Sequence, residues 1–310
     1  MNVIKLKNFP LVSIITVNYN HSETTIELIE SLSKISYPNI EIIVVDNASP
    51  DDDPKLIKQK YPSVILIESV INYGFAGGNN LGIMRARGDY VLLLNNDVIV
   101  PVDFLEPLVF KLVNNPDYGA ISPKIHYYHT LNTIQYAGFT PIDTKTVRNM
   151  TIGKGELDKG QYDRDYETAY AHGAAMMVPM DVIKHVGMMS YEFFLYYEEA
   201  DWCNRIRNAG YKIGYVHNSK VFHKESVTTG KLGVIKVYYL TRNRLVYMRR
   251  NIYGTDFLVS MFYQIFIAIG KNAFTYLLKG NIKIFWAYIR AINWNIKNMF
   301  NVEIHDNPRL

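Results

Sequence analysis

Several features that often reveal the class of a protein are scarce in this sequence. Cys203 is the only cysteine among 310 residues, so an internal disulfide is excluded and a reducing compartment is favoured. The net charge is only +4, which gives no reason to expect a nucleic-acid partner. Residues 1–10 lack the apolar block of a secretory signal. We therefore expect a cytoplasmic protein without nucleic acid, in which Cys203 is a small packing residue.

Long apolar runs are also missing. No stretch has the roughly 18 uninterrupted apolar residues of a confident membrane span. The nearest candidate, residues 257–269, is too short and is followed by Lys271. Hydrophobic residues nevertheless make up 48% of the chain, enough for one large domain or for one domain with a smaller appendage.

The N-terminal part of the sequence alternates between apolar runs and helical patterns. The runs at 12–17, 40–45 and 64–68 read as buried strands, and helical segments separate them. Asn20, with Glu23 three residues later, is expected to cap the first helix. This alternation predicts an α/β fold with a mostly parallel central sheet flanked by helices.

Polar residues stand where these strands end. The apolar run Val91–Leu94 stops at Asn95-Asn96-Asp97, and the first two strands end at Asn18-Tyr19 and Asp46. Open α/β sheets bind ligands at the carboxyl ends of their strands, and a buried acid there needs a cation or hydrogen-bond donors. Turn formation accounts equally well for Asn95–Asp97, as does helix capping for Asp46. The pattern thus predicts the floor of a binding cleft and leaves the kind of ligand open.

Residues 72–82 form a glycine-rich segment. Glycines at 74, 77, 78 and 82 would allow close backbone approach and free amides ahead of a helix, which suits an anionic ligand. A tight loop that lets the helix pack closely explains them as well. Ala76 breaks the G-x-G-x-x-G pattern and no Walker lysine follows, so a dehydrogenase or a P-loop protein is disfavoured.

The second half begins with a hairpin-containing insertion at 124–165 and continues to a cluster of acids. The aromatic stretch 191–197 leads into Glu198, Glu199 and Asp201, on a helix that should end at Gly210. Apolar surroundings raise the pKa of a carboxylate toward values useful to a general base. Acids in a first helical turn are also ordinary complements of the helix dipole. His223 ends a later strand, where a lone histidine is more often structural than a ligand.

In this order the motifs resemble glycosyltransferase family 2, the inverting GT-A class, and its rhamnosyltransferase-like branch most of all. The resemblance covers about 12–250. It is carried by 17–20 (VNYN), 44–49 (VVDNAS), 72–82, 94–97 (LNND), 197–201 (YEEAD) and 221–224 (VFHK). Any one of these motifs is weak, and the ordered set is strong.

The resemblance implies a role for each matching position. Asp46 corresponds to the acid that holds the uracil or thymine ring of the donor. Asp97 corresponds to the last acid of the D-x-D metal motif, with Asn95 in place of the first, and His223 to a second metal ligand; the cofactor would be Mg²⁺ or Mn²⁺. The implied nucleotide-binding positions are Thr16, Asn18, Tyr19, Asp46, Gly77, Gly78, Asn79 and Asn96.

The general-base position of the family is filled by Glu199, one methylene longer than the usual aspartate. Asp201 and Glu198 are the alternatives. The implied reaction is a single in-line displacement with inversion. It moves a sugar from a nucleoside-diphosphate donor, dTDP-rhamnose or a UDP-hexose, to a saccharide or lipid-linked saccharide in cell-surface polysaccharide synthesis. A sugar nucleotidyltransferase and a non-catalytic nucleotide-binding relic of the same fold are the alternatives.

The predicted organisation is a GT-A catalytic domain at 1–230 with a helical C-terminal extension at 231–310. Within the domain, 10–122 is the nucleotide-binding half and 123–230 the acceptor-binding half. Residues 255–300 are rich in Phe, Ile, Tyr and Trp with interspersed Lys, which suits helices lying on the inner face of an anionic membrane. A helical cap over the sheet or a homodimer interface is the alternative.

Overall fold

The computed structural model describes residues 9–224 and 233–299. Strands and helices alternate through its first part, as predicted. In chain order they are β1 (Val12–Asn18), α1 (Ser22–Leu32), β2 (Ile40–Asp46), α2 (Lys55–Lys60), β3 (Ile65–Glu68), α3 (Gly74–Arg85), β4 (Tyr90–Leu94), β5 (Val98–Ile99) and α4 (Leu105–Asn114).

The second part completes the sheet and adds the helical region. It comprises β6 (Tyr118–Tyr127), β7 (Ile134–Tyr136), β8 (Tyr166–Glu167), β9 (Ala175–Pro179), α5 (Met180–Val186), the 3₁₀-helix η1 (Tyr191–Phe193), α6 (Glu198–Asn208), β10 (Lys212–His223), α7 (Val234–Asn251), α8 (Gly254–Tyr263), the π-helix η2 (Gln264–Ala268), α9 (Ile269–Leu278) and α10 (Ile282–Lys297). β6 and β7 form the predicted hairpin.

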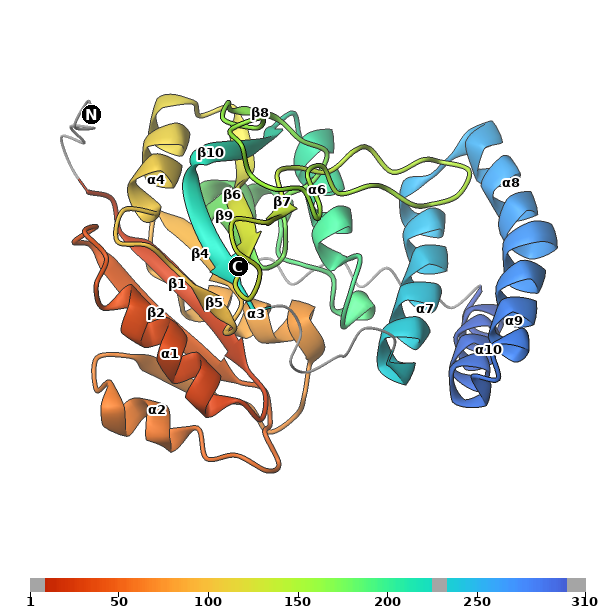
Figure 1. The fold of residues 1–310 in the computed structure, drawn as a ribbon, viewed down its shortest axis with the longest axis horizontal. Helices are drawn as coiled ribbons and strands as arrows, with labels where there is room; N and C mark the ends of the chain where they lie inside the picture. Colours follow the sequence, from red (N-terminus) through yellow and green to blue (C-terminus); the bar gives the residue numbers. More distant parts are fainter. Residues whose placement is uncertain (1–8, 225–232, 300–310) are drawn as a thin grey trace.

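One sheet of ten strands runs through the described residues, in the order β3-β2-β1-β4-β9-β6-β10-β5, with β7 and β8 at its side. β1 to β4 are parallel, and β9 enters antiparallel between β4 and β6. β4 is buried because it lies inside the sheet, which explains its unbroken apolar run. The parallel register therefore brings the ends of β1, β2 and β4 to one edge (Figure 1).

Some local predictions agree with the structure and one does not. Gly210, with φ +94°, follows the end of α6 as predicted, and Cys203 is buried. The capping role predicted for Asn20 is wrong, because Asn20 has φ +59° and α1 begins only at Ser22. The Ser22 amide donates instead to Asp52 Oδ2 at 2.7 Å, so a residue distant in sequence supplies the cap.

The helices α7 to α10 form an arm beside the sheet, with α8 and α9 at its outer side (Figure 1). Residues Gly254–Leu278 are helical throughout, long and apolar enough by length and composition to cross a membrane. The prediction that this stretch is too short was wrong, because Lys271 lies inside the helix and does not end it. The predicted domain boundary at 230/231 lies outside the described residues.

Candidate active site

A hydrogen-bonded network joins the ends of β1, β2 and β4. Asn18 Nδ2 donates to Asp46 Oδ1 at 2.9 Å, and Thr25 Oγ1 donates to Asn18 Oδ1 at 2.8 Å. Asn96 Nδ2 donates in turn to Thr25 Oγ1 at 3.1 Å. Three residues predicted from the sequence thus lie together. Thr25, on α1, joins them and was missed, because nothing in its helical pattern marks it.

Asp46 is the centre of this network. Its side chain is buried, and it also accepts hydrogen bonds from the backbone and hydroxyl of Ser49 at 3.1 and 2.6 Å. The Thr16 hydroxyl is buried nearby on β1 and has no hydrogen-bond partner among the described residues. Tyr19 follows β1 directly and is half-buried. A buried hydroxyl without a partner is costly unless a ligand or water satisfies it.

The glycine-rich segment is organised differently from the prediction. α3 begins at Gly74, and its leading amides all have protein acceptors. The Tyr73 amide donates to Asn47 Oδ1, that of Gly74 to Asn72 Oδ1, and those of Phe75 and Ala76 to the Phe194 carbonyl. The expectation of free amides for an anion is therefore wrong.

Gly77, Gly78 and Asn79 lie inside α3. A Cβ atom on Gly77 would come within 2.4 Å of Tyr73 Cβ, and one on Gly78 within 3.0 Å of a Val17 methyl. Asn79 donates to the Phe75 carbonyl at 2.9 Å. These glycines let the helix pack closely, which is the alternative that the sequence left open.

Asp97 and His223 meet at the next strand end, as the motif predicts. β5 pairs with β10 so that His223 is opposite Val98, and His223 Nε2 lies 3.0 Å from Asp97 Oδ1. Both side chains are nearly buried, at 9% and 6% exposure. His223 Nδ1 lies 2.8 Å from Oε1 of Gln135, on β7. Gln135 was missed, because the alternation of apolar and polar residues in β7 does not show which distant residue Gln135 will contact.

This arrangement fits a divalent cation. Oε1 of Gln135 can only accept, so Nδ1 of His223 carries a hydrogen and Nε2 is the ring nitrogen that faces Asp97. Two acceptors at this distance need a proton or a cation between them. A ligand histidine whose other nitrogen donates to a fixed acceptor is the usual arrangement in metal sites. No group of three or more His, Cys, Asp or Glu among the described residues is placed to hold a metal, so substrate oxygens would have to complete the coordination.

Glu198 and Glu199 open α6; the Glu198 side chain is buried and that of Glu199 is half-buried. In each, Oε2 is buried and has no hydrogen-bond partner among the residues that the structure describes. Burial raises the pKa of Glu199 above its ordinary value. Burial and, after it, the charge of Glu199 raise the pKa of Glu198 well above that value. A raised pKa is what a carboxylate needs to act as a general base near neutral pH.

Asp201 is placed very differently from the two glutamates. Its Oδ1 accepts from Arg250 Nε and from Asn251 Nδ2, each at 3.0 Å, and its Oδ2 accepts from Arg205 Nε at 3.1 Å. The side chain is 1% exposed. Because both oxygens accept from strong donors on α6 and α7, Asp201 joins the two helices.

The turn before α6 has an unusual backbone. Phe194, Tyr196 and Tyr197 have φ of 61°, 70° and 75°, a left-handed conformation that costs non-glycine residues energy. Asn243 Nδ2, from α7, lies 2.7, 2.7 and 2.8 Å from the carbonyl oxygens of Phe193, Leu195 and Tyr196. The turn's Phe194 carbonyl also closes the amino end of α3, which follows the carboxyl end of β3. The glutamates therefore begin at the same sheet edge as Asp46 and Asp97.

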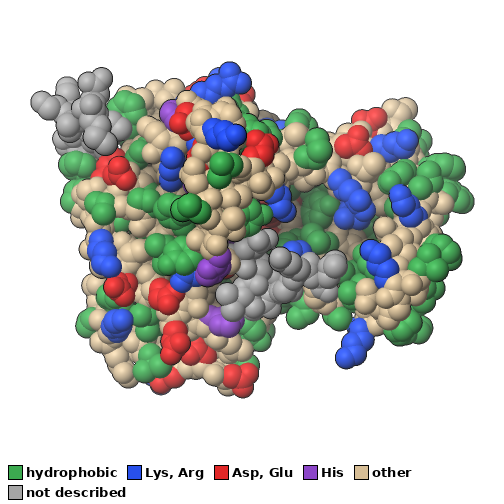
Figure 2. All heavy atoms as spheres, viewed as in Figure 1, with side chains coloured by type: hydrophobic (Ala, Val, Ile, Leu, Met, Phe, Trp, Pro, Cys, Tyr) green, Lys and Arg blue, Asp and Glu red, His purple; other side chains and the backbone are tan. Residues whose placement is uncertain are grey.

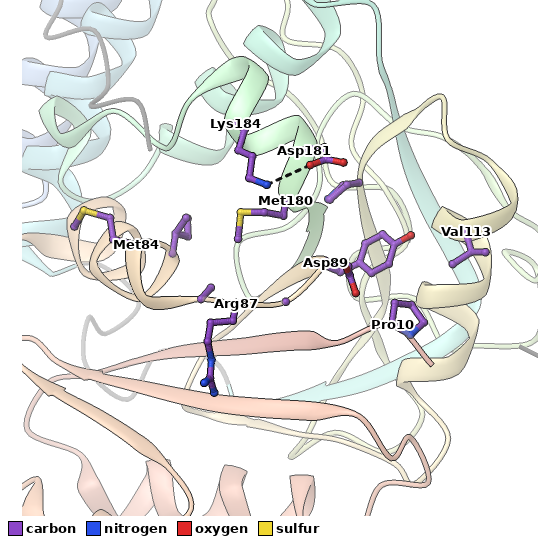
Figure 3. Close-up of a pocket in the computed structure, with 13 residues that line it drawn as sticks. Pro10, Met84, Arg87, Asp89, Val113, Met180, Asp181 and Lys184 are labelled. Carbon is purple, nitrogen blue, oxygen red and sulfur yellow. Dashed lines mark hydrogen bonds and ion pairs between the residues drawn. The ribbon is translucent and has the colours of Figure 1, made fainter. Parts of the chain in front are cut away.

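A large groove lies at the opposite edge of the sheet. It has a volume of about 1020 Å³ and lies beside the amino end of β4 and the carboxyl end of β9 (Figure 3). Its charged groups are engaged within the protein: Arg87 pairs with Glu41 at 2.8 Å and Lys184 with Asp181 at 3.4 Å, and Asp89 accepts from the Leu11 amide. The groove has no cluster of free acids, so we place the chemistry at the carboxyl edge.

Comparison with known proteins identifies the family. The model of glycosyl transferase family 2 matches residues 13–187. The chain belongs to this family. It is 28% identical over 244 residues to the low-salt glycan biosynthesis hexosyltransferase Agl10 of Haloferax volcanii, over 76% of this chain and 74% of that protein. It is 22% identical over 241 residues to the N-acetylglucosaminyl-diphospho-decaprenol L-rhamnosyltransferase of Mycobacterium tuberculosis, over 70% of this chain and 77% of that protein.

Solved structures give the same fold. The mannosyltransferase PcManGT of Pyrobaculum calidifontis, solved in complex with GDP-Man and Mn²⁺, superimposes with a TM-score of 0.59 at 16% identity, over 96% of this chain and 89% of that one. The predicted family and the GT-A fold with a helical C-terminal part are confirmed. The protein is therefore a family 2 glycosyltransferase with a function in glycan biosynthesis.

Proposed function

We propose that this glycosyltransferase moves a sugar, with inversion, from a nucleoside-diphosphate donor to a saccharide or lipid-linked saccharide in cell-surface polysaccharide synthesis. The observation that carries the proposal is the placement of two carboxyls of raised pKa, Glu198 and Glu199, at the same sheet edge as the Asp97–His223 pair. The name of the mycobacterial relative, a rhamnosyl transfer to a diphospho-lipid, supports dTDP-rhamnose and a lipid-linked acceptor. UDP-hexoses are the second choice of donor.

The donor nucleoside would lie over the ends of β1 and β2. Asp46, held by Asn18, is placed to accept from the NH group of a uracil or thymine ring. The buried Thr16 hydroxyl offers a further hydrogen bond, and Tyr19 a ring to stack on. Gly77 and Gly78 would support the nucleoside site by letting α3 pack closely against β1. Asn79 would hold the backbone of α3 through the Phe75 carbonyl, and Asn96 would hold Thr25.

The leaving diphosphate would lie next to Asp97 and His223. These two side chains would hold the cation, Mg²⁺ or Mn²⁺, with Gln135 fixing the imidazole. When bound, such a cation acts as a Lewis acid that offsets charge on the leaving nucleoside diphosphate. Asn95, whose Nδ2 lies 3.5 Å from His223 Nε2, occupies the remaining position of the motif.

Proton removal from the acceptor is assigned to Glu199. Its raised pKa and its lack of a hydrogen-bond partner at Oε2 suit a base that must accept a proton as the hydroxyl attacks. Glu198 is more deeply buried, and its strongly raised pKa favours the protonated form, so it would share a proton with Glu199. Asp201, bound by Arg205, Arg250 and Asn251, is assigned to holding α6 in place.

The test compares two substitutions in the full-length protein. Glu199→Gln should lower turnover by about 10²-fold or more while nucleotide affinity stays the same. Asp97→Asn should weaken the Mn²⁺-dependent binding of UDP or dTDP, measured by calorimetry, and leave binding without metal unchanged. Turnover of the Glu199 variant near the wild-type rate would reject the assigned base. Release of pyrophosphate from a nucleoside triphosphate would point to a nucleotidyltransferase, and binding without any turnover to a relic.

We further propose one catalytic domain that includes α7. β6 crosses the boundary predicted at 122/123, so the two predicted halves share one sheet and do not fold apart. Asn243 and Arg250 of α7 hold the turn and the helix that carry the glutamates. The predicted extension then contributes to the site through α7, and only α8 to α10 stand apart from it.

A further inference from the structure

The long helix Gly254–Leu278 turns its polar side toward the protein. Ser260, Gln264 and Ala268, spaced four residues apart, are its buried positions, with exposures of 0%, 4% and 6%. Gln264 Nε2 donates to the Thr146 carbonyl at 3.1 Å, and Asn272 Nδ2 to the Tyr288 hydroxyl at 3.4 Å. A helix on the surface of a protein in water normally buries its apolar side. This helix instead buries Ser260 and Gln264 most deeply, while its apolar residues Phe257 and Met261 are only partly buried against the core.

Its outer side is correspondingly apolar. Phe262 and Phe266 are 59% and 69% exposed and lie one turn apart. Figure 2 shows hydrophobic side chains gathered along the edge formed by α8 and α9, with Lys and Arg among them. The patch, here named the arm face, consists of Leu258, Val259, Phe262, Ile265, Phe266, Phe274, Leu277, Leu278, Ile282 and Trp286. A contiguous patch of this kind marks an interaction surface.

The charge around the arm face is mainly positive, with Asp256, exposed in the first turn of α8, as its nearby acid. Residues 257–299 contain no Asp or Glu, and their cations are Lys271, Lys279, Lys283, Arg290 and Lys297. Lys279 and Lys283 are exposed in the connection between α9 and α10 and at the start of α10, beside Leu278 and Ile282 of the arm face. An apolar strip with a cationic fringe complements the acyl boundary and the head groups of an anionic bilayer.

From these observations we infer that the arm face lies on an anionic membrane, with its aromatic and aliphatic side chains in the acyl boundary and its lysines among the head groups. The helix lies along the surface and does not cross it, because Gln264 and Ser260 on its inner side pack against the rest of the chain. A second copy of the same chain fits less well, since α8 to α10 carry five cations and one acid, Asp256, so two such faces would repel each other. This inference does not depend on which sugar is transferred.

The test is flotation of the full-length protein with vesicles of phosphatidylcholine, alone or with about 30% phosphatidylglycerol. We expect the protein to float with the anionic vesicles. Phe262→Glu with Phe266→Glu should lower the bound fraction by about tenfold or more, because both exposed side chains become charged without disturbing the buried side. Lys279→Gln with Lys283→Gln should lower binding to anionic vesicles by about tenfold and leave binding to neutral vesicles the same.

The matched control is Phe110→Glu with Val113→Glu. These residues are 40% and 45% exposed on α4, a helix far from the arm (Figure 1), and the substitution should leave flotation unchanged. Equal flotation of the wild type and the Phe262/Phe266 variant would overturn the inference. So would a wild type that does not float but elutes as a dimer that this variant converts to a monomer. Resistance of bound protein to alkaline carbonate would show a spanning helix and would overturn the surface placement.

Discussion

Replacing Asn243 with aspartate tests whether α7 positions the catalytic turn. The substitution keeps the size and shape of the side chain and removes both N–H donors. A carboxylate would then face the carbonyl oxygens of Phe193, Leu195 and Tyr196, which lie 2.7 to 2.8 Å from Asn243 Nδ2. Asn243 is fully buried, so water cannot replace the lost donors without a rearrangement. The substitution therefore changes only the hydrogen bonds that Asn243 donates to the turn.

The magnitude follows from the number of bonds. The Phe193 carbonyl keeps a bond from the Leu195 amide, so the loss falls on the carbonyls of Leu195 and Tyr196. Each buried carbonyl left without a donor costs roughly 1–3 kcal/mol, so the free energy of unfolding should fall by about 2–6 kcal/mol. The turn's left-handed residues, each costing about 1–3 kcal/mol, are then free to relax. A relaxation that moves Glu199 by about 1 Å should lower kcat by about 10²-fold. Nucleotide affinity should change little, because Asn243 does not contact the ends of β1 and β2.

The assay follows nucleoside-diphosphate release with Mn²⁺, together with nucleotide titration and thermal unfolding. The control is Asn295→Asp, since Asn295 is another buried asparagine of the helical region and donates to the Arg242 and Ala291 carbonyls. The control should lose stability but keep kcat. A folded Asn243 variant with kcat within about twofold of the wild type, or equal losses of kcat in both variants, would refute the positioning role.

Three further predictions concern the same region. Gly74→Ala should destabilise the protein by about 2 kcal/mol or more in thermal unfolding, because φ is +69° and a Cβ would clash with the Phe194 carbonyl. Gly270→Ala should instead stabilise the protein by up to about 1 kcal/mol, because its Cβ would meet open space inside a helix. Because the pKa of Glu199 is raised, kcat/KM should rise with pH through that raised value. The stability that this group contributes is complete below its ordinary pKa and is lost as the pH rises through the raised one. Glu199→Gln should therefore unfold at a higher temperature than the wild type at about pH 9. Asp201→Asn should lower the unfolding free energy by about 3 kcal/mol, since it removes the buried carboxylate that pairs with the partly buried Arg205 and Arg250, and a loss below about 1 kcal/mol would contradict that role.

Local pattern predicted much of the fold and of the site. The apolar runs indicated the parallel strands, and the polar residues at the strand ends singled out Asn18, Asp46 and Asp97 as candidates for the site. These predictions hold because strand burial and the position of a strand end are set by short stretches of sequence. The pairing of Asp97 with His223 came from the family resemblance, and the structure brings the two residues together.

The remaining features depend on contacts between distant segments. Nothing near Gln135 says that it will face His223, which lies 88 residues away. The leading amides of α3 could not be assigned from residues 72–82, because one acceptor, Phe194, belongs to a distant turn. Asp201 could not be separated from Glu199 by position alone, since both stand in the first turn of α6 and only the packing of α7 brings Arg250 and Asn251 to Asp201. The length of the outer helix was underestimated because a single charge, Lys271, interrupts its apolar run without ending the helix.

The closed amino end of α3 has a consequence for how this enzyme would manage negative charge. Many nucleotide-binding sheets direct the positive end of a helix dipole at a phosphate. Here the amides at that end donate to the carbonyl oxygen of Phe194, so the positive end of the helix dipole is already paired within the chain. Phosphate charge at the sheet edge must be neutralised by other groups, so removal of divalent ions should impair donor binding more severely than in a protein whose phosphates sit on a helix terminus.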